Sequence, residues 1–470
     1  MENAKKINVV HYAICAAFCL LFRFVPGFAG ITPMGMGILG TFIGAVYGWM
    51  TIGTLWPSVM AMLGLGLSIG MTNLMVAGFG NNTFTCLIFC MLAVGIGIKN
   101  GAFNWLAMKV LTNKFLEGKP YVMLFAVFII SWLTGSFNPI IMCVIVCAFM
   151  TSIFEQVGVK KDDPLVVFTF LGIAYQLMRG QILFPFFGTS LVLIGAYNAM
   201  FPNIPMDMTA YFSMMIIMGL IMAVVYLALM KFVFRVDVTP LANYRLEGTT
   251  PAATKGQKYA LIIFVVFLAG AILSSLSVPF ISPFLKKFDV LGLSLLLGCA
   301  AALIKDENGK PLANMDEMLR MADWGLLCMM VYIMTLSSYM NTPATGIGTA
   351  MGYLFQPFMS LPPIVFIIVV MIIATLLTNV ANNVMVAVVC MPFLANFASL
   401  VGLSPVGMVI LVFIISEFAL ATPGASPVTA VAFTQDYVTS SSMTKAALKI
   451  LPFLFVIFLV IAWPLVDILF

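Results

Sequence analysis

Apolar runs close to the length of a bilayer span recur along the whole chain. Examples are MMIIMGLIMAVVYLALM before the midpoint, IVFIIVVMIIATLL in the second half and FLFVIFLVIAW near the end. A helix of about 20 apolar residues crosses the hydrocarbon core, where every backbone N–H and C=O must be paired inside the protein. Only 8% of the residues are charged, against roughly 25% in soluble domains. The sequence therefore predicts an all-α polytopic membrane protein.

The lysines and arginines predict the orientation of the spans. If the N-terminus is cytoplasmic, 18 of the 22 fall in cytoplasmic segments, which agrees with the positive-inside rule. The N-terminus is basic and then apolar and lacks a small-residue cleavage site, so we expect an uncleaved first span. The orientation of the spans also explains the net charge of +5, so this charge does not imply a nucleic-acid partner. The expected location is the plasma (inner) membrane.

The nine cysteines do not predict a metal site. Six of them form i,i+4 pairs inside apolar segments: Cys15/Cys19, Cys86/Cys90 and Cys143/Cys147. The only histidine is His11, whereas a metal site needs histidine or carboxylate partners and a polar second shell. Buried, reduced thiols are the better interpretation, and no disulfide is implied.

Two apolar segments carry a polar bend in the same register. At an offset of 244, LTGSFNPIIMCVIVCAFMTSIFEQVG (133–158) aligns without a gap with LTNVANNVMVAVVCMPFLANFASLVG (377–402). Seven of the 26 positions are identical, including a Thr-x-x-x-Asn frame at both bends: Thr134/Thr378 and Asn138/Asn382. The charges place the first segment as re-entrant from the cytoplasm and the second as re-entrant from outside.

Opposite orientation of two such copies is the signature of an inverted-repeat transporter, whose broken helices meet near the bilayer midplane. We therefore expect about 11 transmembrane helices and two re-entrant helical hairpins. The first repeat is 1–234, with hairpin 119–157 and broken helix 164–197. A cytoplasmic linker, 235–257, follows, and the second repeat is 258–470, with hairpin 361–400 and broken helix 404–435.

These features resemble the divalent anion/sodium symporter family, the sodium–dicarboxylate and sodium–sulfate cotransporters. The likeness rests on ITPMGMGILGTFIGAVYGW, on FLGIAY at 170–175 and on the two hairpins, and it covers nearly the whole chain. Each hairpin tip of that family carries Ser-Asn-Thr. Here the triplets are Phe137-Asn138-Pro139 and Ala381-Asn382-Asn383. Both asparagines are kept, and the serines and threonines are absent, which leaves the sodium sites and the substrate open.

The resemblance implies a site built from the two tips and the two helix breaks, FPFFGTS (184–190) and ATPGASP (421–427). With the residue-based candidates added, the predicted substrate-binding residues are Ser136, Asn138, Arg179, Gly188, Thr189, Asn382, Asn383, Thr422 and Pro423. The predicted Na⁺ ligands are Thr134, Asn138, Gly188, Thr378, Asn382 and Gly424. Each asparagine has an alternative role as a hairpin cap, and each break has one as a proline kink.

Two charged residues lie inside apolar segments, where a charge is costly and predicts function. Arg179 could bind a carboxylate or sulfate with its planar fork. It could instead extend to an interface or pair with Glu417, an acid one turn before the second break. Glu417 is accordingly either a proton or cation site or the partner of Arg179.

The sequence predicts a secondary active transporter, not an enzyme. The resemblance implies a small di- or tricarboxylate substrate such as succinate, malate, 2-oxoglutarate or citrate, coupled to Na⁺ in an elevator mechanism, and no cofactor is expected. The alternatives are a sulfate or other inorganic divalent-anion carrier and an H⁺-coupled or exchanging carrier. A channel and an intramembrane protease fit the pattern less well. Small residues in ILGTFIGAVYGWMTIG suggest close helix packing and a homodimer.

Overall fold

The computed structural model describes residues 9–245, 250–275, 279–320 and 322–470. Over these residues the secondary structure is helical apart from one isolated bridge between Lys305 and Pro311. The helices of the first half are α1 Val9–Leu21, α2 Pro33–Thr51, α3 Leu55–Ile69, α4 Met71–Leu74, α5 Asn82–Lys99, α6 Ala102–Leu111, α7 Pro120–Thr134, α8 Pro139–Gln156, α9 Pro164–Gly180, α10 Gly188–Met200 and α11 Met208–Ala228. Those of the second half are α12 Lys255–Ser275, α13 Ile281–Leu303, α14 Met315–Arg320, α15 Trp324–Met340, α16 Ile347–Phe355, α17 Pro363–Thr378, α18 Asn383–Val401, α19 Pro405–Ser416, α20 Pro427–Phe433 and α21 Ser440–Leu469.

Seven helices of the described chain are long and apolar enough to cross a membrane, or eight if one bent pair counts as a single span. Six further apolar helices have only 10–17 residues. Several of the spans expected from the sequence coincide with these shorter helices, among them α9 and α19. α9 and α19 are short because a break divides each expected span into two half-helices, and a half-helix stops before it has crossed the bilayer.

Proline starts many of these helices. At the first position of a helix its missing N–H costs nothing, since that N–H has no intrahelical partner, and its fixed φ suits the helix. This explains why Pro139 follows the polar residue Asn138 at the first hairpin bend. Proline occupies the first turn of α2, α7, α8, α9, α17, α19 and α20.

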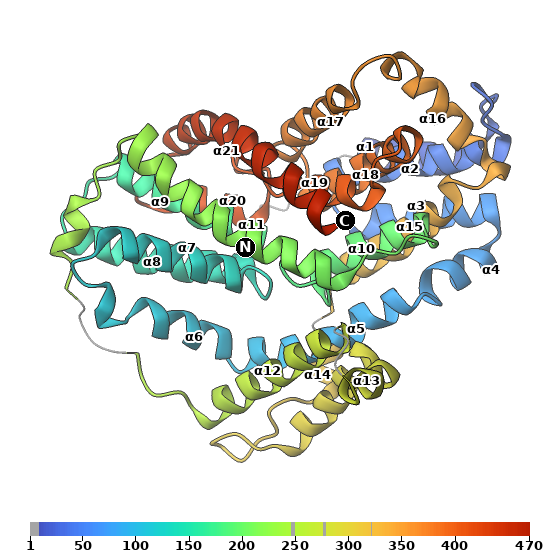
Figure 1. Cartoon of the computed structure of the whole chain (residues 1–470). Helices are drawn as coiled ribbons and strands as arrows, with labels where there is room; N and C mark the ends of the chain where they lie inside the picture. The colour runs from blue at the N-terminus through green and yellow to red at the C-terminus, as the bar shows by residue number, and fades with distance from the viewer. Residues whose placement is uncertain (1–8, 246–249, 276–278, 321) are drawn as a thin grey trace.

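The first halves of the two broken helices form the centre of the molecule. Every residue of α19 is buried, and so is every residue of α9 except Pro164. The second half-helices cross over: α10 packs against α18 and α19, whereas α20 packs against α8 and α9. Segments far apart in sequence therefore lie side by side, as Figure 1 shows for α20 beside α9. Each hairpin is held by a half-helix from the other repeat.

The glycines of α2 pack inside the chain. A Cβ added to Gly40 would lie 2.3 Å from Phe22 Cβ, and one added to Gly44 would lie 2.6 Å from Cys19 Sγ. On Gly48 it would lie 2.5 Å from Pro57 Cβ. The close packing that the small residues predict is thus between α2 and its neighbours in the same chain, and these glycines give no support to a homodimer.

Two helices change direction sharply. The helical segment Ile347–Phe358 and α17 meet at 111°, where Pro362 and Pro363 prevent the helix from continuing. In α13, Asp289 has φ 58° and ψ 168°, a conformation outside the helical region. Asp289 also accepts a hydrogen bond from the N–H of Val290 at 2.6 Å, which helps to hold this kink.

Candidate functional site

The two hairpin bends have the same construction. α7 ends at Thr134 and α8 begins at Pro139, while α17 ends at Thr378 and α18 begins at Asn383. The offset of 244 that aligns the sequences therefore also relates the last residue of one arm and the first residue of the next. The four-residue bends are 135–138, called tip 1 below, and 379–382, called tip 2.

An asparagine caps the second arm of each hairpin. Asn138 Oδ1 accepts from the N–H of Ile141 at 3.1 Å. Asn382 Oδ1 accepts from the N–H groups of Val384 and Met385 at 3.0 and 3.4 Å. The capping role that was one alternative for these residues is thus present in the structure. Because capping uses the oxygen, the NH₂ group is the part of each side chain that an anion would meet.

Tip 2 is bonded to the second helix break, 417–426. Asn379 Oδ1 accepts from the N–H groups of Leu420 and Ala421 at 2.8 and 2.6 Å. Its Nδ2 donates to Phe418 O at 3.1 Å, and Thr422 Oγ1 donates to Asn379 O at 2.6 Å. The break has no helical ladder, so these bonds pair backbone groups that would otherwise be unsatisfied.

Sequence reasoning missed Asn379. The available signal was the third amide in LTNVANN, which has no equivalent in the first hairpin, where Gly135 stands at the matching position. Two predicted residues join the same interface: Thr378 Oγ1 donates to Ser416 O, and Asn383 Nδ2 donates to Glu417 Oε2 at 2.6 Å. Tip 2 and the second break therefore form one hydrogen-bonded unit.

Tip 1 contacts the end of α9, just before the first helix break (181–187), through close backbone packing. A Cβ on Gly135 would lie 2.2 Å from Leu177 O, and a Cβ on Gly180 would lie 2.2 Å from Trp132 O. Only glycine allows this approach. Ser136 Oγ donates to Gly180 O, so this predicted substrate residue is engaged with α9.

Phe137, where the resembled family has serine, stacks in an aromatic cluster. Its ring is 3.9 Å from that of Phe103 at an interplanar angle of 10°, and 4.9 Å from that of Phe264. It also stacks on Phe184 and Phe187 of the first break, at 6.0 and 6.2 Å. Tip 1 is therefore seated against α6 and α12 by ring packing, which a serine could not supply.

The predicted residues of the breaks have different surroundings. Gly188 begins α10 with φ +63°, and Gly188 and Thr189 are half-buried. Pro423 and Gly424 are exposed and line a cavity of ≈ 280 Å³ together with Asn382. Trp49 of α2 also lines it, a residue that sequence reasoning did not single out. The structure thus brings the second-repeat candidates together.

The candidate residues of the first repeat and those of the second repeat are connected only through neighbouring residues. Ser426 Oγ lies 3.0 Å from Met178 Sδ of α9, and Cys143 Sγ of α8 donates to Val428 O at 3.6 Å. No hydrogen bond joins Asn138 to Asn382 among the described residues. The hairpins meet across the crossed half-helices and not tip to tip.

Arg179 is buried behind the first break. Its Nη2 donates to Met218 O of α11 at 2.7 Å, its Nη1 donates to Gln176 Oε1 at 3.4 Å, and its guanidinium lies 5.3 Å from the ring centre of Tyr175. In this conformation the fork holds α9 to α11. No ion pair within 4.0 Å joins Arg179 to Glu417 in the described part of the chain. Its contact with substrate stays a prediction.

The predicted Na⁺ ligands would supply hydroxyl, amide and backbone oxygens. Thr134 Oγ1 donates to Ile130 O at 2.6 Å, and Thr378 Oγ1 donates to Ser416 O, so both hydroxyls keep lone pairs for a cation. No group of three or more His, Cys, Asp or Glu side chains that could hold a metal occurs within the described ranges. All nine cysteines are unpaired, and seven of them are buried.

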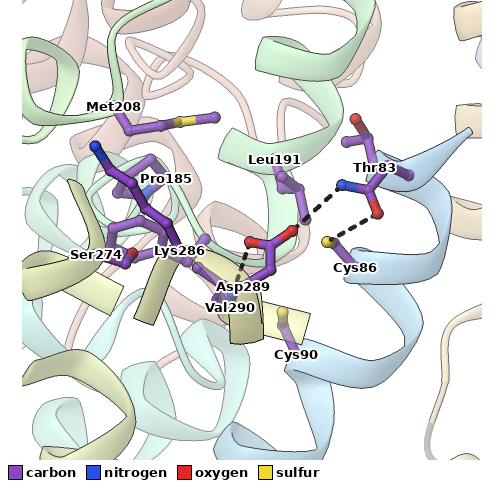
Figure 2. Close-up of a pocket in the computed structure, with 12 residues that line it drawn as sticks. Thr83, Cys86, Cys90, Pro185, Leu191, Met208, Ser274, Lys286, Asp289 and Val290 are labelled. Atoms are coloured by element: carbon purple, nitrogen blue, oxygen red, sulfur yellow. Dashed lines mark hydrogen bonds between the residues drawn. The ribbon is translucent and has the colours of Figure 1, made fainter. Parts of the chain in front are cut away.

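A second cavity, of ≈ 380 Å³, opens onto the first break (Figure 2). Pro185 and Phe186 of the break line it, and Lys286 and Asp289 come from α13. Asn82, at the start of α5, donates to Asp289 Oδ2 at 3.5 Å. The cavity therefore combines the exposed ammonium group of Lys286 with the hydrogen-bonded carboxylate of Asp289. Both lie next to Pro185 and Phe186, which precede α10.

Comparisons with known proteins agree with this architecture. A family model described as citrate transporter, CitMHS, matches residues 42–416. The solved structure of the YdaH transporter of Alcanivorax borkumensis, which is described as having an unusual topology, has a similar fold, with a TM-score of 0.58. The two share 12% identity over 85% of this chain and 90% of that one. No curated protein matches the sequence.

The matched family covers most of the chain, and the similar fold is that of a transporter. The protein is therefore a membrane-embedded, multi-pass secondary carrier of a small anion, and this is a carrier's function, not an enzyme's. The resemblance to divalent-anion symporters is confirmed at the level of the family. The chain belongs to the citrate transporter family.

Proposed function

We propose that this carrier moves small di- or tricarboxylates, citrate among them, across the plasma membrane with Na⁺ as a coupling ion, with its N-terminus in the cytoplasm. The observation that carries the proposal is the packing of each asparagine-capped tip against a helix break, through the ring of Phe137 at tip 1 and through the hydrogen bonds of Asn379 at tip 2. The description of the matched family supports citrate as a substrate.

A carboxylate is favoured at the N-terminus of a half-helix, where backbone N–H groups and the helix dipole present positive charge. α8, α10 and α18 all begin at a tip or a break. Asn138 and Asn382 add NH₂ donors at two of these ends. Lys286, exposed in the cavity beside the first break, adds an attractive charge on the approach.

Sodium would be held by oxygens at the helix ends next to the tips and breaks and by oxygens of the second break. Hydroxyls of Thr134 and Thr378, together with carbonyls near Gly188 and Gly424, are hard ligands of the type that alkali cations take. A cation bound there would also reduce the cost of placing a multivalent anion in the membrane interior.

The proposed movement is an elevator, in which 119–200 and 361–436 slide against the rest of the chain. The contact of tip 1 with α6 and α12 supports it, because aromatic rings form this contact and, among the described residues, no hydrogen bond joins Phe137 to either helix. An apolar interface can shift without leaving buried polar groups unpaired.

The first experiment is uptake into proteoliposomes with a panel of succinate, malate, 2-oxoglutarate, citrate and sulfate, with and without a Na⁺ gradient. We expect saturable uptake of at least one carboxylate, stimulated by inward Na⁺. Saturable uptake of sulfate alone would favour the inorganic-anion alternative. Uptake that does not saturate, with no counterflow, would contradict a carrier.

Asn382→Asp tests the tip directly. Aspartate caps a helix as well as asparagine does, so the N–H groups of α18 stay paired. The new negative charge would repel a carboxylate, and we expect uptake to fall by about tenfold or more, a loss of about 1.4 kcal/mol in binding. Thermal stability in detergent should remain that of the native chain.

Asn113→Asp is the matched control, because Asn113 also caps a helical turn, with its Oδ1 2.9 Å from the N–H of Phe115, but on the surface. This variant should transport normally. If Asn382→Asp also transports normally, the side chain of Asn382 is only a cap and the substrate site lies elsewhere.

A further inference from the structure

The cavity of ≈ 380 Å³ beside the first break is separate from the tips, since none of the described residues that line it belongs to a tip (Figure 2). Its volume falls in the range of small-molecule sites, about 300–1,000 Å³. Phe186 and Leu191 form part of an apolar wall, and Lys286 and Asp289 of α13 supply the charges. α12 leads from the cytoplasmic linker and is long enough to cross the membrane. In the proposed orientation, the start of α13 and the cavity therefore face outside.

The kink in α13 holds the two charges apart. Residues three positions apart on a regular helix are neighbours, so a lysine and an aspartate at 286 and 289 would be expected to pair. Asp289, with φ 58° and ψ 168°, interrupts the helix at this point. No ion pair within 4.0 Å joins Lys286 to Asp289 in the described part of the chain. In Figure 2 the ammonium group of Lys286 extends toward Met208 and Pro185, while the carboxylate of Asp289 turns toward α5. The cavity therefore has separate positive and negative poles.

The carboxylate of Asp289 can accept from a further donor. Its Oδ1 accepts from the N–H of Val290 at 2.6 Å, and its Oδ2 accepts from Asn82 Nδ2 at 3.5 Å. An ionised carboxylate has about four lone-pair positions, so these two bonds fix its direction and leave acceptor capacity free. A positive φ is uncommon for a residue other than glycine, and strained positions of this kind concentrate at ligand-binding sites. Asp289 is thus positioned to accept a hydrogen bond from a bound molecule.

We propose that this cavity is an outer binding site for 2-hydroxycarboxylates, the class that includes citrate and malate, which is occupied before the substrate reaches the tips. The proposal rests on the proposed function. The ammonium group of Lys286 binds a carboxylate, and Asp289 accepts the hydrogen bond of the hydroxyl. Pro185 and Phe186 belong to both the cavity wall and the first break, so a bound acid lies beside the residues that lead into α10.

The hydroxyl distinguishes this class from plain carboxylates. Tricarballylate is citrate without the hydroxyl, and succinate is malate without it. A hydroxyl donates to Asp289, whereas a carboxylate in the same place would be repelled by its negative charge. The two poles therefore favour citrate over tricarballylate through an attractive and a repulsive contribution together.

The test compares citrate with tricarballylate in proteoliposomes that contain the full chain. We expect the wild-type half-saturation concentration to be about three- to tenfold lower for citrate. In Asp289→Asn this preference should fall by about threefold or more, because the charged acceptor and the repulsion are both lost. Asparagine tolerates a positive φ and can still accept from Val290, so the kink is kept. No preference in the wild type, or an unchanged preference in Asp289→Asn, would overturn the proposal.

Lys286→Gln tests the positive pole, with Lys287→Gln as its matched control. Loss of the Lys286 charge should raise the half-saturation concentration of both acids by about two- to fivefold, the size of an exposed charge interaction. Lys287 is also exposed but does not line the cavity, and its substitution should leave both values unchanged. Equal effects of the two variants would overturn the site. Absence of saturable uptake of any carboxylate by the wild type would contradict the proposed function instead.

A second measurement needs no transport. In detergent-solubilised protein, a sulfonated succinimidyl ester acylates exposed amines, and mass spectrometry locates the modified lysines. Citrate should slow the acylation of Lys286 by about threefold or more, with weaker protection by tricarballylate and no effect of either acid on Lys287. Acylation of Lys286 at the same rate with and without citrate would overturn the proposal, whatever the uptake measurements show.

Discussion

Asn379, Asn382 and Asn383 each make a structural hydrogen bond at or beside tip 2, where Asn382 and Asn383 are also proposed to bind substrate. Asn379 pairs backbone groups of the second break, Asn382 caps α18, and Asn383 bonds to Glu417. An amide suits all three places because it offers an acceptor and two donors without a charge. Substitution by alanine therefore mixes loss of fold with loss of function, and variants must be chosen to separate them.

Asn379→Ala should destabilise the protein without any change in the substrate-facing groups. It leaves the buried N–H groups of Leu420 and Ala421 without their acceptor, at an expected total cost of about 2–5 kcal/mol. Thermal unfolding in detergent measures the effect. Asn396→Ala is the control, since Asn396 bonds mainly within α18, to Pro392 O at 2.9 Å. Equal stability of the two variants would show that the bonds to the break contribute little.

At the scale of elements, one loop residue joins the first repeat to the last helix. Asp162 precedes α9, and its Oδ1 accepts from Thr439 N at 2.7 Å and from the hydroxyl of Ser442. These residues form the N-terminal capping box of α21. The donors, Ser442 first and Thr439 next, lower the pKa of Asp162 below its usual value, because they favour the charged form.

This linkage predicts a pH dependence for the junction. A carboxyl whose pKa is lowered by folding stabilises the protein above its unfolded pKa of about 3.9, and that stabilisation is lost as pH falls through the lower native value. Asp162→Asn should therefore lower the melting temperature at neutral pH, with a difference from wild type that shrinks toward pH 3. Melting curves from pH 3 to 7 measure it.

Asp237→Asn is the control for this experiment. The side chain of Asp237 also accepts hydrogen bonds, but from Thr239, two residues away, so it joins no separate elements. Its substitution should have a smaller effect at neutral pH. A larger effect than that of Asp162→Asn would mean that the bonds to α21 do not secure the junction.

At the scale of the whole molecule, the crossed half-helices join the hairpins into one buried unit. α10 packs on α18 and α19, and α20 packs on α8 and α9 (Figure 1). Around this unit, α1–α3 pack together and α5 packs with α12 and α13. This arrangement suits the proposed elevator movement.

Single cysteines at matched positions test that topology. Ser136→Cys and Val380→Cys lie at the same place in the two tips, 244 residues apart, in a background with exposed Cys299 and half-buried Cys328 replaced by serine. With an impermeant maleimide in the cold, we expect at least about a tenfold faster reaction at Ser136→Cys from the cytoplasmic side and at Val380→Cys from outside. Faster reaction of both from one side would contradict the inverted arrangement.

The sequence by itself determined the features that depend on local order. Apolar runs specify helices that can lie in lipid, because hydrocarbon accepts no unpaired backbone. The bends at 135–138 and 379–382, the asparagines that cap them and the broken helices follow from proline, glycine and amide positions along the chain. The pattern repeated at an offset of 244 is enough to align the two hairpins from the sequence alone.

Only the tertiary structure decided which polar groups meet. The local sequence does not predict that Asn379 bonds to residues about 40 positions later. It also does not predict that Phe137 packs among rings of α6 and α12, or that Arg179 bonds to Met218 and not to Glu417. These contacts depend on how the helices cross, and crossing is set by the packing of many side chains at once. For that reason the candidate site could be assigned to its segments from sequence, whereas the partner of each residue could not.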